Sequence, residues 1–260
     1  MKLDLLAVGL SMPGLAGWAA SQAVLRGEQA HALAELPPSA MTLLPANERR
    51  RAPPTVRLAF AAAEDAVDNG GLQPADWATV FVTSEADTPI IHRICHALAE
   101  PARLVSPTDF HNCVHNAAAG YWSIAAGCRL PSSSLSAWDL SFSAGLLEAG
   151  ALALAEGLPV LLVAYDLPPP VPLYASRKIA QPAALALALR APGAGPALAR
   201  LQLQRGAADE AESRCADASL EALRLSNPAA RALPLLVALA QARGSVVLPA
   251  VAGTLRVALS

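Results

Sequence analysis

The stretch Ser141–Asp166, SFSAGLLEAGALALAEGLPVLLVAYD, decides the fold. Small and apolar residues fill Ser141–Ala155, and Gly157 directly behind them is a typical helix terminator. The run Pro159–Tyr165 that follows is short and continuously apolar, as expected of a strand buried on both faces. A helix that leads directly into a buried strand is a building unit of α/β proteins.

The same alternation of strands and helices extends toward the beginning of the chain. We expect strands at Leu3–Leu10, Trp77–Thr83 and Ser133–Ser136, and helices at Gly14–Arg26, Thr55–Asn69, Thr88–Ala99 and Asn116–Ala126. The proline-rich residues 34–54 are expected to form a loop. Together these elements predict an α/β fold with a parallel-biased sheet that helices cover on both faces.

A triple proline, Pro168–Pro170, marks a change in character, so we predict a first domain over residues 1–170 and a shorter portion over residues 171–260. In the second portion, Ala183–Leu189 and Ala197–Gln204 alternate in polarity and are predicted to form a hairpin around Pro192-Gly193. The remaining expectations are a polar loop at Gly206–Asp217, a helix at Leu233–Gln241, and closing strands at Ser245–Leu248 and Gly253–Ala258.

The composition excludes several classes of protein. Of the 260 residues 54% are hydrophobic and only 15% are charged, which excludes global disorder. The net charge of −2 leaves no basic surplus for neutralising phosphates, so nucleic-acid binding is disfavoured. A chain this apolar is expected to cover part of its surface with a partner. An alanine-rich composition from a GC-rich genome is the alternative explanation.

The hydrophobic windows lack the features of export signals and membrane spans. Residues 3–25 contain Asp4 and are interrupted by Pro13, Gly14 and Gly17. Residues 145–165 contain Glu148 and Glu156, whose charges would be costly in a bilayer. The four cysteines are too few for a disulfide scaffold and suit a reducing compartment. We therefore expect a cytoplasmic protein with no membrane span.

Four of the five histidines lie between Ile91 and Asn116, close to two cysteines. Their spacing does not match a known zinc pattern, because no glutamate follows His92 in the HExxH manner. Cys113 and His115 are a second possibility, as a nucleophile and its base, although no third orienting residue is identifiable. A buried structural thiol is the simpler interpretation of Cys113. We expect no metal and no cofactor.

The stretch Ser106–Gly127, SPTDFHNCVHNAAAGYWSIAAG, resembles the N-terminal half of β-ketoacyl synthases. The agreement includes Leu44–Arg51, Ser141–Ala149 and Val160–Asp166, so it covers residues 1–170 in order and 171–205 more loosely. More narrowly, the chain is similar to the short chain-length-factor-like subunits of aryl polyene and xanthomonadin-type pigment biosynthesis. The resemblance implies a thiolase-like fold, a mixed sheet covered by helices that is normally duplicated within one chain. In a chain this short, the second half must be reduced.

The chain departs from active synthases where their chemistry takes place. Those enzymes carry a cysteine, in a pattern like T-A-C-S-S, where a strand meets a helix. The matching stretch here is Ser136–Ser141, with Asp139 at the cysteine position, or Trp138 if the alignment slips by one. Neither side chain can form an acyl thioester. The two catalytic histidines of a synthase come from its second half, whereas no histidine of this chain lies beyond His115.

The resemblance therefore implies a non-catalytic partner of an active β-ketoacyl synthase in a heterodimer, with an acyl carrier protein involved only indirectly. Polyene, polyketide and fatty-acid-type synthesis are the processes that it implies. The expected partner-facing segment is Ser106–Trp122, with Phe110, His115, Asn116 and Trp122 as candidates. Trp138 and Phe142 are candidates either for the wall of an acyl tunnel or for ordinary core aromatics. The alternative is a stand-alone acyl-thioester hydrolase or decarboxylase that uses Asp139 or the Cys113/His115 pair.

Overall fold

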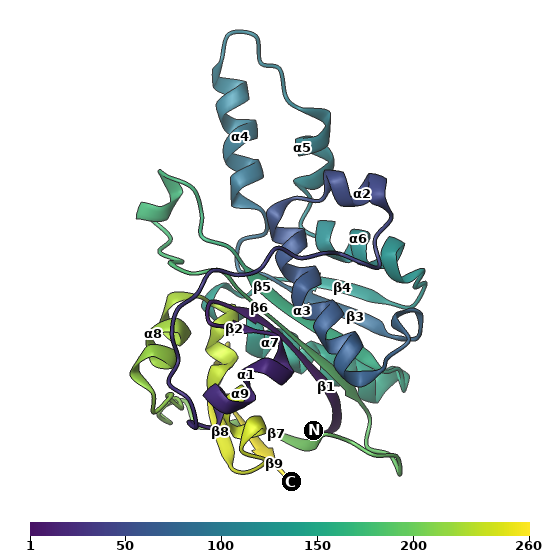
Figure 1. Cartoon of the computed structure of the whole chain (residues 1–260), viewed down its shortest axis with the longest axis vertical. Helices are drawn as coiled ribbons and strands as arrows, with labels where there is room; N and C mark the ends of the chain where they lie inside the picture. Colours follow the sequence, from purple (N-terminus) through teal and green to yellow (C-terminus); the bar gives the residue numbers. More distant parts are fainter.

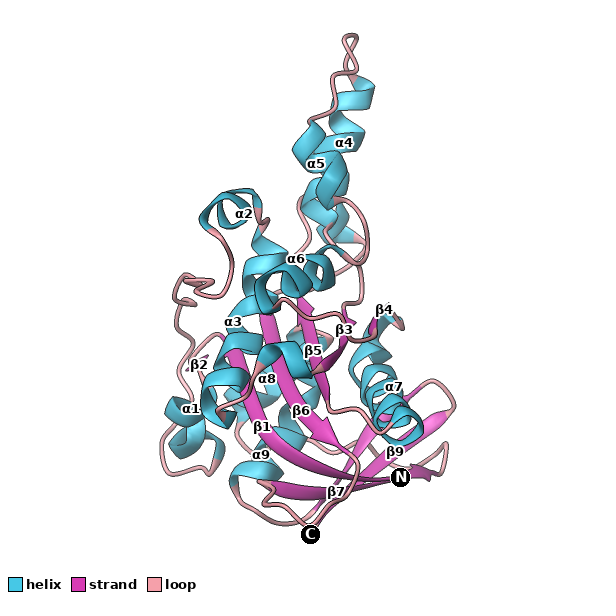
Figure 2. Ribbon diagram, turned by 90° about the vertical axis from the view of Figure 1, so that its right-hand side faces the viewer, coloured by secondary structure: helices cyan, strands magenta, loops and turns pink.

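The computed structural model describes residues 1–260, and its strands form one strongly curved sheet (Figures 1 and 2). The strands are β1 (Lys2–Met12), β2 (Leu15–Ala16), β3 (Ala78–Val82), β4 (Ser132–Leu135), β5 (Val160–Asp166), β6 (Ala183–Arg190), β7 (Ala199–Gly206), β8 (Ser245–Ala250) and β9 (Gly253–Leu259). The helices are α1 (Trp18–Leu25), α2 (Ala46–Arg51), α3 (Pro54–Gly70), α4 (Thr88–Ala99), α5 (Pro107–Asn112), α6 (Ala117–Ala126), α7 (Ser141–Glu156), α8 (Ala218–Ser226) and α9 (Leu233–Ala240). None of these helices combines the length and apolar character that crossing a bilayer requires.

The sheet follows the order β4-β3-β5-β6-β1-β7-β9-β8. Strands β3, β4 and β5 run parallel, whereas β6 is antiparallel to both of its neighbours, β5 and β1. Every residue of β3 and β5 is buried, as expected of strands that helices cover on both sides. The predicted mixed, helix-covered sheet is therefore confirmed. The expected parallel bias is wrong, because all the other pairs of neighbouring strands are antiparallel. A continuous apolar run did not reveal this, since the antiparallel strand β6 is as buried as a parallel one.

Two hydrophobic clusters lie on opposite faces of the sheet. Helix α3 covers one face together with α6, and Phe60 and Trp122 meet there edge to face at 5.2 Å. The alanines of α3 allow the helix to lie close to β1, where the carbonyl of Ala62 leaves no space for a side chain at Gly9. Helices α7 and α9 cover the other face, as Figure 2 shows for α7.

The second portion of the chain repeats part of the first. In the first portion, helix α7 leads into the antiparallel pair β5–β6, and β1 lies beside β6. In the second, helix α9 leads into the antiparallel pair β8–β9, and β7 lies beside β9. The two units meet where β1 pairs antiparallel with β7. The second unit contains no counterpart of β3 and β4. The expected reduction of the second half is therefore the loss of these two strands.

The predicted hairpin of β6 and β7 is wrong, because β1 lies between these two strands. Asp4 of β1 stands opposite Arg190 of β6 on one side and opposite Arg200 of β7 on the other. Its carboxylate is fully buried, lies 3.7 Å and 3.5 Å from the two guanidinium groups, and accepts the amide of Gly193 at 3.0 Å. The connection after β6 thus crosses the end of β1 instead of turning back on itself.

Three short helices were not predicted. Helix α2 lies in the expected loop, between Pro45 and Pro53, and has only six residues. Helix α5 is equally short and begins at Ser106, whose hydroxyl accepts the amide of Asp109 at 3.3 Å. Helix α8 starts directly after the expected polar loop, where the Asp217 side chain caps it. Helices α2 and α5, with six residues each, contain too few apolar residues to show a period.

We predict that Asp4→Ala destabilises the fold by about 1–2 kcal/mol, because it removes the acceptor of the Gly193 amide and the ion-pair partner of Arg190 and Arg200. Asp4→Asn retains an oxygen for Gly193 and should cost less than half as much. Urea unfolding followed by circular dichroism measures both values. Equal stability of Asp4→Ala and the parent protein would contradict a central role for this carboxylate.

Candidate functional site

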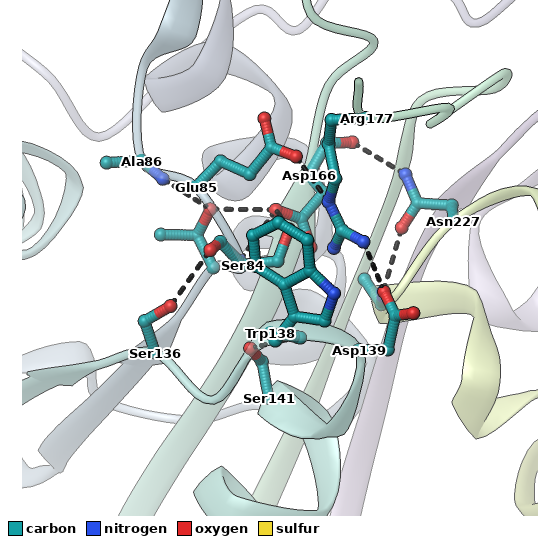
Figure 3. Close-up of polar contacts among 12 residues, drawn as sticks. Ser84, Glu85, Ala86, Ser136, Trp138, Asp139, Ser141, Asp166, Arg177 and Asn227 are labelled. Atoms are coloured by element: carbon teal, nitrogen blue, oxygen red, sulfur yellow. Dashed lines mark hydrogen bonds and ion pairs between the residues drawn. The ribbon is translucent and has the colours of Figure 1, made fainter. Parts of the chain in front are cut away.

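The turn between β4 and α7 is the sharpest feature near the ends of the parallel strands (Figure 3). Trp138 adopts a left-handed backbone with φ of 56°, which is unusual for a bulky residue. Ser141 stabilises this turn, because its hydroxyl accepts the amide of Ala137 at 3.0 Å and donates to the carbonyl of Trp138 at 2.6 Å. The turn, residues 136–140, is called the elbow below.

Arg177 covers the elbow from the segment that connects β5 to β6. Its guanidinium carbon lies 3.9 Å from the centre of the Trp138 ring, a cation–π contact. The same group donates from Nε to Glu85 at 2.5 Å and from Nη1 to Asp139 at 2.6 Å. The side chains of Arg177 and Glu85 are only 13% and 11% exposed, so this ion pair is largely removed from water. Burial raises the pKa of Glu85, which Arg177 partly offsets.

A second polar cluster ties together the ends of the parallel strands beneath the elbow. Asp166 ends β5 and accepts three hydrogen bonds, from the Ser84 amide at 2.7 Å, the Ser84 hydroxyl at 2.9 Å and the Thr83 hydroxyl at 2.9 Å. Ser136 donates to the Ser84 carbonyl at 2.9 Å, which attaches the end of β4. Complete burial raises the pKa of Asp166 to about 7.

Asn227 links this cluster to the second portion of the chain. Its side-chain amide donates to the carbonyl of Asp166 at 2.9 Å (Figure 3) and to the carbonyl of Gln181 at 2.7 Å. The residue is buried and follows the last turn of α8. The segment that carries Arg177 is therefore bound at both of its ends, near Asp166 and near Gln181.

The polar side chains at the elbow are paired with one another. The side chains that bond to one another at the elbow are serine, aspartate, glutamate and arginine, with tryptophan stacked on the arginine. The Ser141 hydroxyl is engaged on both sides by backbone groups, and the Asp139 carboxylate accepts from Arg177. No thiol or imidazole takes part in these contacts, so the cluster contains no acyl-accepting nucleophile with its base.

The structure does not bring Cys113 and His115 into contact. The Cys113 thiol donates to the carbonyl of Phe110 at 3.1 Å. His115 Nε2 is buried without a hydrogen-bond partner in the chain, and burial lowers its pKa. No cluster of three or more potential metal-ligating side chains is present.

The partner-facing candidates occupy two different environments. Phe110, on α5, is 69% exposed, and Asn116 is exposed at the start of α6. Trp122 lies in the core, at 1% exposure, and so does Phe142 at the start of α7. Trp138 is 59% exposed at the elbow.

Helices α4 and α5 project far from the body of the molecule (Figures 1 and 2). We call residues 88–112, with the turn between the two helices, the arm. Only Ile90 of α4 is buried. Apolar side chains of the arm face solvent: Ile91 is 41% exposed, Leu98 51%, Leu104 81% and Phe110 69%.

Sequence reasoning missed Glu85 and Arg177. Glu85 lies three residues after the end of β3, and Arg177 lies in a proline-rich connection with no regular pattern. Glu85 follows the parallel strand β3, and Asp166 ends the neighbouring parallel strand β5. Because the ends of parallel strands meet at one edge of the sheet, this pattern could have indicated that Glu85 lies near the site. Arg177 carries no comparable signal.

Comparisons with known proteins agree with this architecture. The family described as beta-ketoacyl synthase, N-terminal domain, matches residues 17–241. No curated protein matches the chain. Among solved structures, the complex of the ketosynthase ApeO with its chain length factor ApeC from Xenorhabdus doucetiae is similar, with a TM-score of 0.76 and 22% identity over 99% of each chain.

Two further structures share the fold at lower identity. A complex of the type II polyketide acyl-carrier protein AntF with its ketosynthase AntDE has a TM-score of 0.73 and 12% identity, covering 100% of this chain and 99% of that chain. The ishigamide ketosynthase/chain length factor has a TM-score of 0.67 and 15% identity over 98% of each chain. These similarities confirm the thiolase-like ketosynthase fold that the sequence predicted.

We predict that Asp166 makes stability depend on pH. Its pKa is about 7 in the fold and the ordinary value is 3.8, so the folded chain holds a proton that the unfolded chain releases. The stabilising contribution of the neutral carboxyl is therefore complete below pH 4 and is lost as the pH rises through 7. Relative to Asp166→Asn, the parent protein should lose about 2–3 kcal/mol between pH 5 and 8 in urea unfolding. An identical pH dependence of the two proteins would refute this role.

Proposed function

The chain belongs to the β-ketoacyl synthase N-terminal domain family, and from that membership we propose that it is a non-catalytic, chain-length-factor-like partner of an active β-ketoacyl synthase. The process is acyl-carrier-protein-dependent synthesis of an aryl polyene, polyketide or fatty-acid-type chain. The chain acts within a heterodimer in the cytoplasm and needs no cofactor of its own. The acyl carrier protein reaches it only through the complex.

The single observation that supports this proposal most is the occupied elbow. In an active synthase of this fold, the turn between strand and helix presents a thiol, as the resemblance implies. Here Trp138 has the left-handed backbone of the turn and Asp139 is bound by Arg177. We infer that Trp138 stands at the cysteine position and that Asp139 follows it. A condensation that needs a thioester on the enzyme has no acceptor at this place.

The arm supports the partner half of the proposal. Exposed apolar side chains on a projecting pair of helices cannot be buried by the chain itself, and such surfaces mark protein interfaces. Phe110 is the aromatic residue of this surface, and large aromatic side chains contribute most to interface energies. Phe110 lies within the partner-facing segment Ser106–Trp122, and we propose it as an anchor.

The free edge of strand β4 is a second surface that supports an interface with the partner synthase. It is the terminal strand, so one of its edges has no neighbouring strand in this chain. Its side chains are Ser132, Ser133, Ser134 and Leu135, and none of them is fully buried. Unpaired strand edges bind other strands readily, and an additional chain removes that liability. The partner synthase would cover this edge.

Neither version of the stand-alone enzyme is favoured. Cys113 and His115 make no contact with one another, and the thiol bonds to a backbone carbonyl instead. Asp139 is the partner of a largely buried guanidinium, so its use as a base or nucleophile would leave that cation unpaired.

We predict that Phe110→Glu weakens the heterodimer about 30-fold or more, the equivalent of roughly 2 kcal/mol for an aromatic anchor. Leu225→Glu is the matched control, because Leu225 is an exposed leucine, at 54%, on α8 and away from the arm. Co-expression with the active synthase, followed by affinity purification and titration, measures both. Equal binding of Phe110→Glu and the parent chain would remove the arm from the interface.

We predict further that the purified chain does not turn over an acyl thioester by itself, whereas the complex elongates it. Release of free thiol from an acyl-pantetheine thioester is the measurement. Thiol release by the isolated chain that is abolished in Asp139→Ala would overturn the non-catalytic assignment in favour of a hydrolase, and release of CO2 from a malonyl-pantetheine thioester would do so in favour of a decarboxylase.

A further inference from the structure

We propose that Arg177 is a latch that holds Trp138 across the elbow and closes this chain's own acyl-transfer position to pantetheine-linked thioesters. Arg177 acts through Trp138 and is therefore a positioning residue. The inference rests on the proposed function and adds to it a structural reason why acyl chains remain with the partner subunit.

Trp138 is held through both its backbone and its ring. A left-handed backbone is unfavourable for a residue with a large side chain and persists only where the surroundings enforce it. The Ser141 hydroxyl enforces it by accepting the amide of Ala137 and donating to the carbonyl of Trp138 itself. The guanidinium carbon of Arg177 lies over one face of the ring, 3.9 Å from its centre.

Two carboxylates hold Arg177 in its place over Trp138. Glu85 comes from the segment after β3, and Asp139 comes from the elbow itself, so the guanidinium is held by two separate parts of the chain. Figure 3 shows the arginine between the two carboxylates and in front of the indole. The third nitrogen of the guanidinium, Nη2, is buried and has no partner in the chain. If the guanidinium rotated to pair Nη2, it would lose the hydrogen bond of Nε or Nη1, so the number of hydrogen bonds would not increase.

An acyl thioester can reach the elbow only by moving the side chains that cover it. A thioester approaching the turn would have to displace the indole from the guanidinium or separate the guanidinium from its carboxylates. An acyl-pantetheine group carries no charge at its thioester, so it offers nothing to a desolvated carboxylate that has lost its arginine. Arg177 with its two carboxylates is therefore harder for a thioester to displace than an apolar side chain of the same size.

The fluorescence of Trp138 provides a direct test. Trp18, Trp77 and Trp122 are 8%, 6% and 1% exposed, so Trp138, at 59%, is the tryptophan that a neutral quencher reaches most easily. Acrylamide quenching would be measured in each protein and in its Trp138→Phe counterpart, and the difference would isolate the signal of Trp138. Each titration would be repeated with S-octanoyl-pantetheine.

In the parent chain, we expect the thioester to leave the quenching of Trp138 unchanged. In Arg177→Ala, both ring faces become accessible, so the quenching constant should rise about twofold, and the thioester should then protect the ring saturably. Arg177→Lys retains a charge without the flat stacking group and should give an intermediate value. Arg256→Ala is the control and should behave like the parent chain. Arg256 lies on β9, far from the elbow, and pairs with Glu210.

An unchanged quenching constant in Arg177→Ala, or protection by the thioester already in the parent chain, would overturn the latch. Should Arg177→Ala not fold, the double variant Glu85→Gln, Asp139→Asn releases the arginine without removing it and is expected to give the same increase. Heterodimer formation, measured separately by affinity purification, distinguishes the two proposals. A parent chain that binds no synthase would refute the proposed function and leave the quenching result standing.

Discussion

The buried carboxylate of Asp4 holds the centre of this molecule together. It stands in β1, the strand through which the two portions of the sheet are joined, and faces an arginine on each neighbouring strand. A charge in such a position is tolerated only where opposite charges and hydrogen-bond donors surround it. Arg190, Arg200 and the amide of Gly193 supply them, so this carboxylate favours one arrangement of three strands over the simpler hairpin. The position of β6, and with it the end of β5 under the elbow, depends on that arrangement.

The second unit of the sheet is an incomplete copy of the first. Strands β7, β8 and β9 with α9 correspond to β1, β5 and β6 with α7, but nothing corresponds to β3 and β4. In the first unit, those two strands position Glu85 and the elbow. The second unit therefore has no elbow of its own. The space above the first elbow is taken by the connection that carries Arg177, which Asn227 ties to the second unit.

Much of the fold could be predicted from the sequence because its signals are local. Helix α4 was predicted with the observed bounds, and the ends of α6 and α7 follow from Gly127 and Gly157, both in the left-handed conformation. The insertion of β1 between β6 and β7 could not be predicted, since the alternation of polar and apolar residues shows which segments are strands but not which strands are neighbours. The site divides in the same way. Trp138 and Asp139 were found from their place in a motif, whereas Arg177 reaches them from a segment without a motif and Glu85 was recognised only in three dimensions.

The central position of β1 also affects how the chain can fold during its synthesis. Leu5 pairs with Leu189 and Leu3 with Leu201, so β1 leaves the ribosome long before either of its neighbours exists. Contacts this distant in sequence form slowly, and an unpaired apolar strand is prone to aggregate while it waits. Nascent chains would therefore depend on a chaperone, or on α3 packing early against the strand, until nearly the whole polypeptide has been translated.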